Sequence, residues 1–314
     1  LFMKIKHLLE YAEASTEDFL KPEIVEVVKK ESSKFINEFL KKGIFIYRGN
    51  DDLPYDELHV IPTMSYREAH GNIFYNDLFQ TSLERYLKDH NIPSRYQYAV
   101  STIAFDPSEF KGVGVDDWYY FIPKGPYRYH YYSNVSNGDI NVDNEAFNRL
   151  AEVSYEIDRI YDYAIGLVYQ KEYVFNNVDN IFHERGEDFV SKLFTLIDKI
   201  RDILSHPMEM VKKDIILLDR IVDEADGLLD VHPSENAGSM ERGVYQDVFD
   251  LFSRLRHTLE TDDLYTPIET FRQSIVADEI TDSIKGSEIV FQCKEYFIVP
   301  MSDDGEEFIR RLLK

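Results

Sequence analysis

The chain has few of the residues that build disulfide frameworks, cysteine-ligated metal sites or membrane spans. Its 314 residues include a single cysteine, Cys293, so neither a disulfide framework nor a cysteine-based zinc site can form within it. There is no run of about 18 apolar residues, so a membrane span is not expected. With so little cysteine, the simplest expectation is a cytoplasmic location.

Basic residues are also scarce compared with acidic ones. The chain has 35 Lys and Arg against 58 Asp and Glu, a formal net charge of −23, which argues against a general nucleic-acid-binding surface. Residues 1–150 hold 17 basic and 23 acidic residues, and residues 151–314 hold the remaining 18 and 35. The first half, at −6 against −17, is therefore the better place for a local anion site.

The apolar residues follow two patterns, which together indicate an α+β fold. Between residues 144 and 275 they recur every three or four positions, which predicts amphipathic helices packed as an inserted bundle. Short β-rich runs flank this region and predict strands at 44–48, 96–105, 118–123, 127–132, 288–292 and 296–300. Gly125-Pro126 and Lys294-Glu295 are expected to form turns between neighbouring strands.

Polar side chains with chemical potential interrupt three of these predicted strands. Arg48 ends the first, and a guanidinium there can hold a phosphate through two parallel hydrogen bonds. Ser101 and Thr102 are adjacent hydroxyls that project to opposite faces of a strand. Glu288 opens a late strand, where a carboxylate can stabilise a cation. Each residue taken alone is more often an ordinary strand residue, so only the combination carries an interpretation.

In combination, these residues resemble the R-S-E class of ADP-ribosyltransferases. Tyr47-Arg48-Gly49 is similar to that family's first strand, and the segment from Gly286 to Val299 is similar to its closing hairpin. The middle of the chain resembles phage-encoded proteins assigned to this fold. The shared features there are Pro62-Thr63, Asn76, Arg95, the strand end from Phe121 to Gly125, and the aromatic run from Tyr127 to Tyr132.

The resemblance implies a domain organisation and an activity. An ADP-ribosyltransferase-like domain with a split mixed or antiparallel sheet would comprise residues 1–143 and 276–314, with the helical bundle of residues 144–275 inserted. The activity would be NAD-dependent mono-ADP-ribosylation, with NAD as a substrate and no metal. The acceptor would be a macromolecule, a protein rather than a nucleic acid. A phage-encoded member would act on host components in the host cytoplasm.

The resemblance also assigns roles to individual residues. Arg48, with Gly49 beside it, would hold the NAD pyrophosphate or the nicotinamide ribose. Ser101, or Thr102 if the register is shifted, would support NAD and orient Glu288. Glu288 would stabilise the oxocarbenium ion as nicotinamide leaves. An aromatic ring from Trp118, Tyr119 or Tyr120 would stack on the nicotinamide.

One position departs from the family pattern. Arginine-modifying members carry a second Glu or Gln two positions before the catalytic Glu, and here that position is Gly286. Other acceptors, or hydrolysis of NAD, therefore stay open. So do two non-enzymatic alternatives: an inactive ADP-ribosyltransferase fold that binds a partner through its helical bundle, and an acidic decoy for a nucleic-acid-binding protein.

Overall fold

The computed structural model describes residues 18–50, 53, 57–63, 77–94, 99–104, 117–133, 145–177, 187–229 and 239–314. The chain divides into two compact units. The sheet unit contains Leu1–His70, Leu87–Asn144 and Gln273–Lys314, and the helical unit contains Gly71–Tyr86 and Glu145–Arg272. Asn76 and Arg95, two of the residues that carry the family resemblance, lie outside the described residues.

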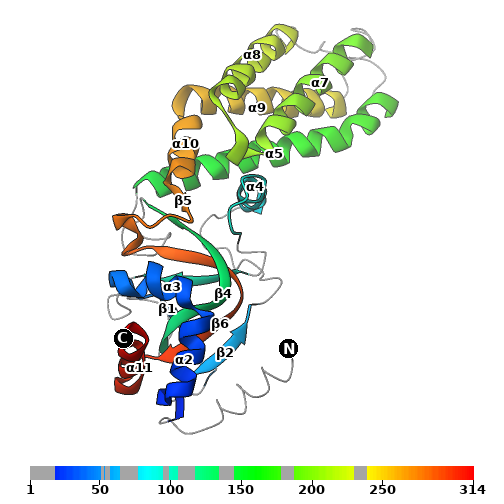
Figure 1. The fold of residues 1–314 in the computed structure, drawn as a ribbon. Coiled ribbons are helices and arrows are strands. Elements are labelled where there is room, and N and C mark those ends of the chain that lie inside the picture. Colours follow the sequence, from blue (N-terminus) through cyan, green and yellow to red (C-terminus); the bar gives the residue numbers. More distant parts are fainter. Residues whose placement is uncertain are drawn as a thin grey trace. The chain divides into compact units, whose positions relative to one another are not determined.

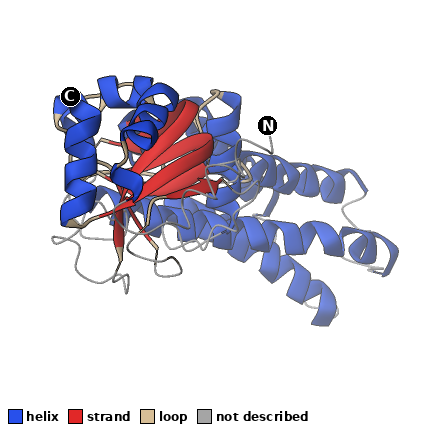
Figure 2. Ribbon diagram, turned by 60° about the horizontal axis from the view of Figure 1, so that its bottom comes forward, coloured by secondary structure: helices blue, strands red, loops and turns tan. Residues whose placement is uncertain are grey.

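The sheet unit is built on one antiparallel sheet of six strands in the order β2-β6-β3-β1-β4-β5 (Figures 1 and 2). Its strands are β1 (Tyr47–Gly49), β2 (His59–Pro62), β3 (Ala99–Ile103), β4 (Trp118–Tyr132), β5 (Ile275–Ala277) and β6 (Glu288–Pro300). Strand β6 also pairs with β4, so the pairings β6–β3–β1–β4–β6 form a closed ring. Helices and an antiparallel sheet therefore coexist, which confirms the predicted mixed class.

Two predicted strand–turn–strand segments are each one continuous strand, which corrects the expected turns. Lys124 of β4 pairs with Glu295 of β6, and Tyr127 pairs with Cys293, so β4 advances by three residues where β6 advances by two. The extra residue at Gly125-Pro126 makes a β-bulge, and Gly125 has the positive φ of 76° that favours glycine. The Lys294-Glu295 pair that suggested a hairpin turn lies within β6.

Strand β1 is shorter and later than predicted. Regular pairing covers Tyr47–Gly49, whereas Ile44–Ile46, part of the predicted strand, lies before it. Ile46 nevertheless contributes to the sheet, because its carbonyl accepts a hydrogen bond from the Phe121 amide at 2.8 Å. Phe45 and Tyr47 are half-buried while Ile44 and Ile46 are buried, which is the alternation expected of extended backbone.

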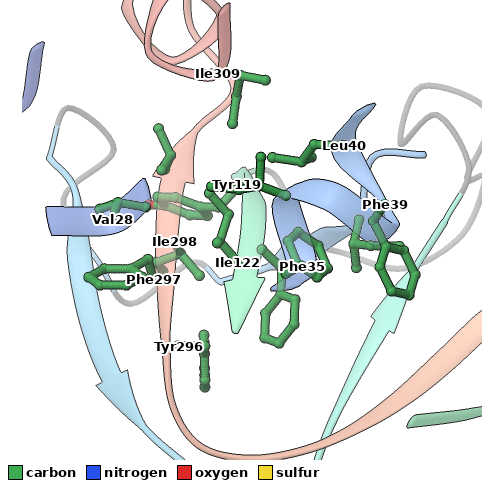
Figure 3. Packing of buried hydrophobic residues seen from close by; sticks show 14 of the residues in the cluster. Val28, Phe35, Phe39, Leu40, Tyr119, Ile122, Tyr296, Phe297, Ile298 and Ile309 are labelled. Atoms are coloured by element: carbon green, nitrogen blue, oxygen red, sulfur yellow. The ribbon is translucent and has the colours of Figure 1, made fainter. Parts of the chain in front are cut away.

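Short helices complete the sheet unit: η1 (Asp18–Leu20), α2 (Pro22–Glu31), α3 (Ser33–Glu38), η2 (Leu40–Lys42), η5 (Asp282–Ile284) and α11 (Asp303–Leu313). Pro22 begins α2, because proline at the first helical position sacrifices no helical hydrogen bond. Phe35 and Phe39 stack at 4.9 Å, and both rings contact Phe291 of β6. Figure 3 shows this core, in which residues of α2, α3 and α11 surround side chains of β4 and β6.

The helical unit contains α5 (Glu145–Asn177), α7 (Glu187–Leu204), η4 (Pro207–Glu209), α8 (Lys212–Leu229) and α9 (Ser239–Thr261), together with most of α4 (Asp77–Asp89) and of α10 (Tyr265–Ser274). Helix α5 packs on α7 and α9, and α8 packs on both of these. Residues 71–86 also belong to this unit, whereas the sequence analysis assigned them to the ADP-ribosyltransferase-like domain and limited the helical insertion to residues 144–275. Among the helices that the structure describes, none has the length and apolar character needed to cross a membrane.

Candidate active site

The three predicted site residues lie on strands that pair in succession. Tyr47 of β1 pairs with Ile103 of β3, and Ile103 pairs with Glu288 of β6. Arg48 follows Tyr47 directly, and Ser101 lies two residues before Ile103. Segments separated by 53 and 187 residues in the chain are thus joined by strand pairing and by side-chain hydrogen bonds to the backbone.

Arg48 is held against the neighbouring strand by its own side chain. Its Nη1 donates to the Ser101 carbonyl oxygen at 2.8 Å in a partly buried setting. Its guanidinium carbon also lies 5.9 Å from the centre of the Tyr296 ring, within the range of a cation–π contact. The structure therefore fixes the guanidinium, as recognition of a phosphate or ribose requires.

The structure distinguishes Ser101 from Thr102. Thr102 is 3% exposed, and its hydroxyl donates to the Ile289 carbonyl oxygen at 3.0 Å, so it ties β3 to β6 and is not available to NAD. Ser101 is half-buried. Because cross-strand partners and alternate residues share a face, Ser101 lies on the same face of β3 and β6 as Glu288. Burial therefore favours Ser101 over Thr102 as the hydroxyl that would contact a cofactor.

Glu288 is half-buried at the start of β6, directly after a tightly held turn. The Ala104 amide donates to the Ser287 carbonyl oxygen at 3.0 Å, which ties this turn to the end of β3. Gly286 has a φ of +96°, and a Cβ there would meet no atom within 4 Å. The need for glycine is therefore conformational. A glutamate at this position would be strained, which gives a physical reason for the departure from the arginine-modifying pattern.

The three aromatic residues of β4 proposed to stack on nicotinamide differ in how deeply they are buried. Tyr119 is fully buried, and its hydroxyl donates to the Leu53 carbonyl oxygen at 3.1 Å, which disfavours Tyr119 as the ring that would stack on nicotinamide. Tyr120 is half-buried and pairs with Tyr47, with ring centres 5.4 Å apart. Since Tyr47 pairs with Ile103, the Tyr120 ring lies on the face that carries Ser101 and Glu288. Trp118 is half-buried too.

Sequence reasoning missed two neighbours of Arg48. Tyr296 was assigned to the second strand of a hairpin, so its place beside the arginine was not foreseen. Burial raises the pKa of Cys293 to about 11, although contact with the Thr63 hydroxyl, 3.6 Å from the sulfur, and then the charge of Arg48 lower it. The thiol is therefore protonated and unreactive at neutral pH.

The described residues contain no group of three or more His, Cys, Asp or Glu side chains that could hold a metal ion. Comparison of the chain with protein-family models, with curated proteins and with solved structures finds no match. The chemistry must therefore be argued from the residues themselves. Ser101, Glu288 and the Tyr120 ring share one face of the sheet, whereas Arg48, which follows Tyr47 and pairs with the buried Tyr119, lies on the opposite face and reaches the Ser101 carbonyl oxygen from there.

Proposed function

We propose that the chain is an NAD-dependent mono-ADP-ribosyltransferase that modifies a macromolecular acceptor. The observation that carries the proposal is the arrangement of Arg48, Ser101 and Glu288 on β1, β3 and β6. Arg48 bonds to the backbone of Ser101 at 2.8 Å, and Ser101 shares a face with Glu288 through the Ile103–Glu288 pair. Three residues far apart in sequence thus lie on strands that pair in succession, β1 with β3 and β3 with β6, which supports the proposal.

The proposed reaction breaks the N-glycosidic bond between nicotinamide and C1′ of its ribose. Nicotinamide leaves with the bonding electron pair, positive charge develops on the ribose, and a nucleophile of the acceptor bonds to C1′ and loses its proton. Arg48 binds the anionic pyrophosphate or the ribose, and Ser101 supports the dinucleotide. Glu288 stabilises the oxocarbenium ion, since a fixed carboxylate opposite developing positive charge lowers the barrier.

The turn at Gly286 bears on the acceptor. Its positive φ disfavours the second carboxylate that accompanies arginine modification in the family. The proposal is therefore a protein acceptor modified at a side chain other than arginine. In a phage setting this acceptor would be a host component.

The test is incubation of the full chain with NAD labelled in the adenylate phosphate, with and without a bacterial lysate. Nicotinamide release measures cleavage, and label on protein, on nucleic acid or on neither measures transfer. Glu288→Gln keeps the shape but removes the charge, so cleavage should fall by about 10²-fold or more while NAD binding persists.

Glu295→Gln is the matched control, because Glu295 is another half-buried glutamate of β6 and pairs with Lys124 at 2.9 Å. It should retain cleavage within a few-fold of the wild type. A wild-type chain that neither binds nor consumes NAD would overturn the proposal in favour of a binding protein. Equal losses in the Glu288 and Glu295 variants would overturn the role of Glu288.

A further inference from the structure

We propose that Tyr131 is a positioning residue for Glu288, acting through the segment from Asp278 to Ser287 that leads into β6. This inference rests on the proposed function for its catalytic part. Tyr131 lies on β4 and is fully buried, and it pairs with Ile289 of β6. Its hydroxyl contacts the segment that precedes Glu288, at a sequence separation of 150 residues.

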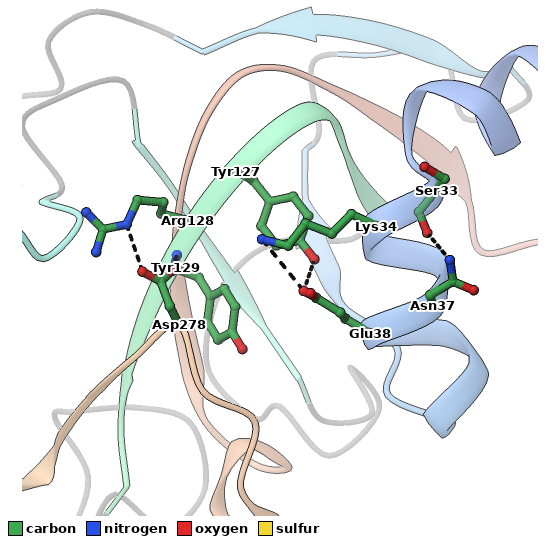
Figure 4. Close-up of polar contacts among 8 residues, drawn as sticks. All are labelled: Ser33, Lys34, Asn37, Glu38, Tyr127, Arg128, Tyr129 and Asp278. Atoms are coloured by element: carbon green, nitrogen blue, oxygen red, sulfur yellow. Dashed lines mark hydrogen bonds and ion pairs between the residues drawn. The ribbon is translucent and has the colours of Figure 1, made fainter.

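The start of the segment is fastened to β4 by Asp278. One carboxylate oxygen accepts from Arg128 Nε at 2.7 Å, and the other accepts from the Tyr129 amide at 2.9 Å (Figure 4). The Asp278 amide in turn donates to the Tyr129 carbonyl oxygen at 3.0 Å. Asp278 has a φ of +53°, a conformation that aspartate tolerates better than most residues. Three hydrogen bonds thus set where the segment leaves the sheet.

The middle of the segment is fastened by the Tyr131 hydroxyl. It accepts from the Thr281 amide at 3.2 Å and lies 2.7 Å from the Thr281 hydroxyl. The Thr281 hydroxyl is 2.6 Å from that of Ser283. Ser287 then donates its hydroxyl to the Ser283 carbonyl oxygen at 2.7 Å. A continuous chain of polar contacts therefore runs from Tyr131 to the residue before Glu288.

The end of the segment is fastened to β3. Ile284 is fully buried, so the turn cannot lift away without exposing it. The Ala104 amide donates to the Ser287 carbonyl oxygen at 3.0 Å. Glu288 is thus held from two sides, by β3 through Ala104 and by β4 through Tyr131. On the β4 side the contact with the segment can be removed with one atom, the Tyr131 hydroxyl oxygen, while the Thr102 hydroxyl of β3 stays bonded to the Ile289 carbonyl oxygen.

Such a support matters because the charge of Glu288 must face the ribose as nicotinamide leaves. Displacement of a catalytic group by about 1 Å can cost about 10²-fold in rate. Loss of the Tyr131 hydroxyl leaves β6 paired and the segment held at both ends, but it removes the contact that holds the middle of the segment. The expected result is a loss of turnover with little change in NAD binding, because Arg48 and Ser101 lie on β1 and β3.

The experiment compares Tyr131→Phe with Tyr127→Phe in the full chain. Tyr127 is the matched control because it is another buried tyrosine of β4, and its hydroxyl donates to Glu38 of α3 at 2.6 Å. Hydrogen exchange of the amides at 279–287 measures directly how firmly Tyr131 holds the segment. The kcat and KM for NAD cleavage measure the effect of that contact on catalysis and on NAD binding. Thr281→Val, which removes one hydroxyl from the other end of the contact, is a second variant in case Tyr131→Phe folds poorly.

In Tyr131→Phe we expect exchange at 279–287 to accelerate about 10-fold and kcat to fall by about 10-fold or more, with KM within about two-fold of the wild type. Tyr127→Phe should change neither. Unaltered exchange in the Tyr131 variant, or an equal fall in kcat in both variants, would overturn the inference. A wild type without NAD cleavage would overturn the proposed function and the catalytic part of this inference, while the exchange data would still decide whether Tyr131 holds the segment.

Discussion

The two units of the molecule use their polar side chains differently. In the sheet unit, partly buried hydrogen bonds connect residues far apart in sequence, such as Arg48 with Ser101 and Tyr127 with Glu38. In the helical unit, several ion pairs lie at the surface within one helical turn, including Arg159 with Glu156. Groups held by long-range contacts are fixed in position, whereas surface pairs are solvated and weak.

This difference shows where chemistry is to be expected. A site needs polar groups whose positions are set by surrounding packing, and the sheet unit supplies them where β1, β3 and β6 meet. In the helical unit several acidic residues face water, as Asp223 and Asp226 do around Arg256, with 65% and 53% of their side chains exposed. We therefore expect the helical unit to serve recognition of an acceptor or partner and to supply no catalytic group.

The largest expected effect tests whether each unit depends on its own core. Phe291 is fully buried in the sheet unit, and Phe252 is 1% exposed in α9 of the helical unit. Either Phe→Ala change should lower the free energy of unfolding by about 3–5 kcal/mol, through lost burial and the cavity left behind. Hydrogen exchange should show the loss mainly in the unit that carries the change. Equal loss of protection in both units would show that they unfold together.

The next effect concerns the pH dependence of the sheet unit. Burial raises the pKa of Cys293 from 9.0 to about 11, so the folded protein keeps a proton that the unfolded chain releases. The thiol's contribution to stability is therefore complete below pH 9 and is lost as pH rises through 11. It amounts to up to about 3 kcal/mol. Denaturant unfolding from pH 8 to 11 should show a steeper fall for the wild type than for Cys293→Ala, and parallel profiles would contradict this.

The contrast between the units also explains what the sequence could predict. Helices between residues 145 and 274 follow from apolar spacing, because Ile157, Ile160, Ala164 and Leu167 repeat within a single element and are all buried. That signal is local, and the structure confirms it. The assignment of residues 71–86 to the helical unit depends on packing against segments distant in sequence. The spacing of apolar residues within 71–86 does not reveal such packing.

In the sheet unit the sequence predicted several of the segments that form strands. It did not predict where two such segments join into one strand, or which residues pair. Gly125-Pro126 has the composition of a turn, yet it forms a bulge because β6 continues alongside it. Likewise, the choice between Ser101 and Thr102 depends on which residue pairs with Ile289. A shift of one residue exchanges the two faces, so only the pairing itself could decide which hydroxyl is buried.

A smaller change in stability is expected when one glycine from each unit is replaced by alanine. Gly286 has a φ of +96°, so Gly286→Ala should destabilise the protein by about 1–2 kcal/mol. Gly227 is within α8 and has open space around its Cα, so Gly227→Ala should stabilise it by about 0.5–1 kcal/mol, because alanine loses less conformational entropy in a helix. Chemical denaturation measures both. Effects of the same sign would contradict the positive φ at Gly286 or the helical setting of Gly227.

The smallest effect tests the surface charges of the helical unit directly. Arg256 is 34% exposed and contacts Asp223 at 3.1 Å and Asp226 at 2.6 Å, so Arg256→Gln should lower the free energy of unfolding by no more than about 1 kcal/mol. High salt should remove most of that difference by screening. The matched change in the sheet unit is Lys124→Gln, because Lys124 is only 13% exposed between Glu31 and Glu295. It should cost more, about 1–3 kcal/mol, since it leaves partly buried carboxylates without their cation. If the Arg256 change costs as much as the Lys124 change, the contrast between solvated and fixed charges is wrong.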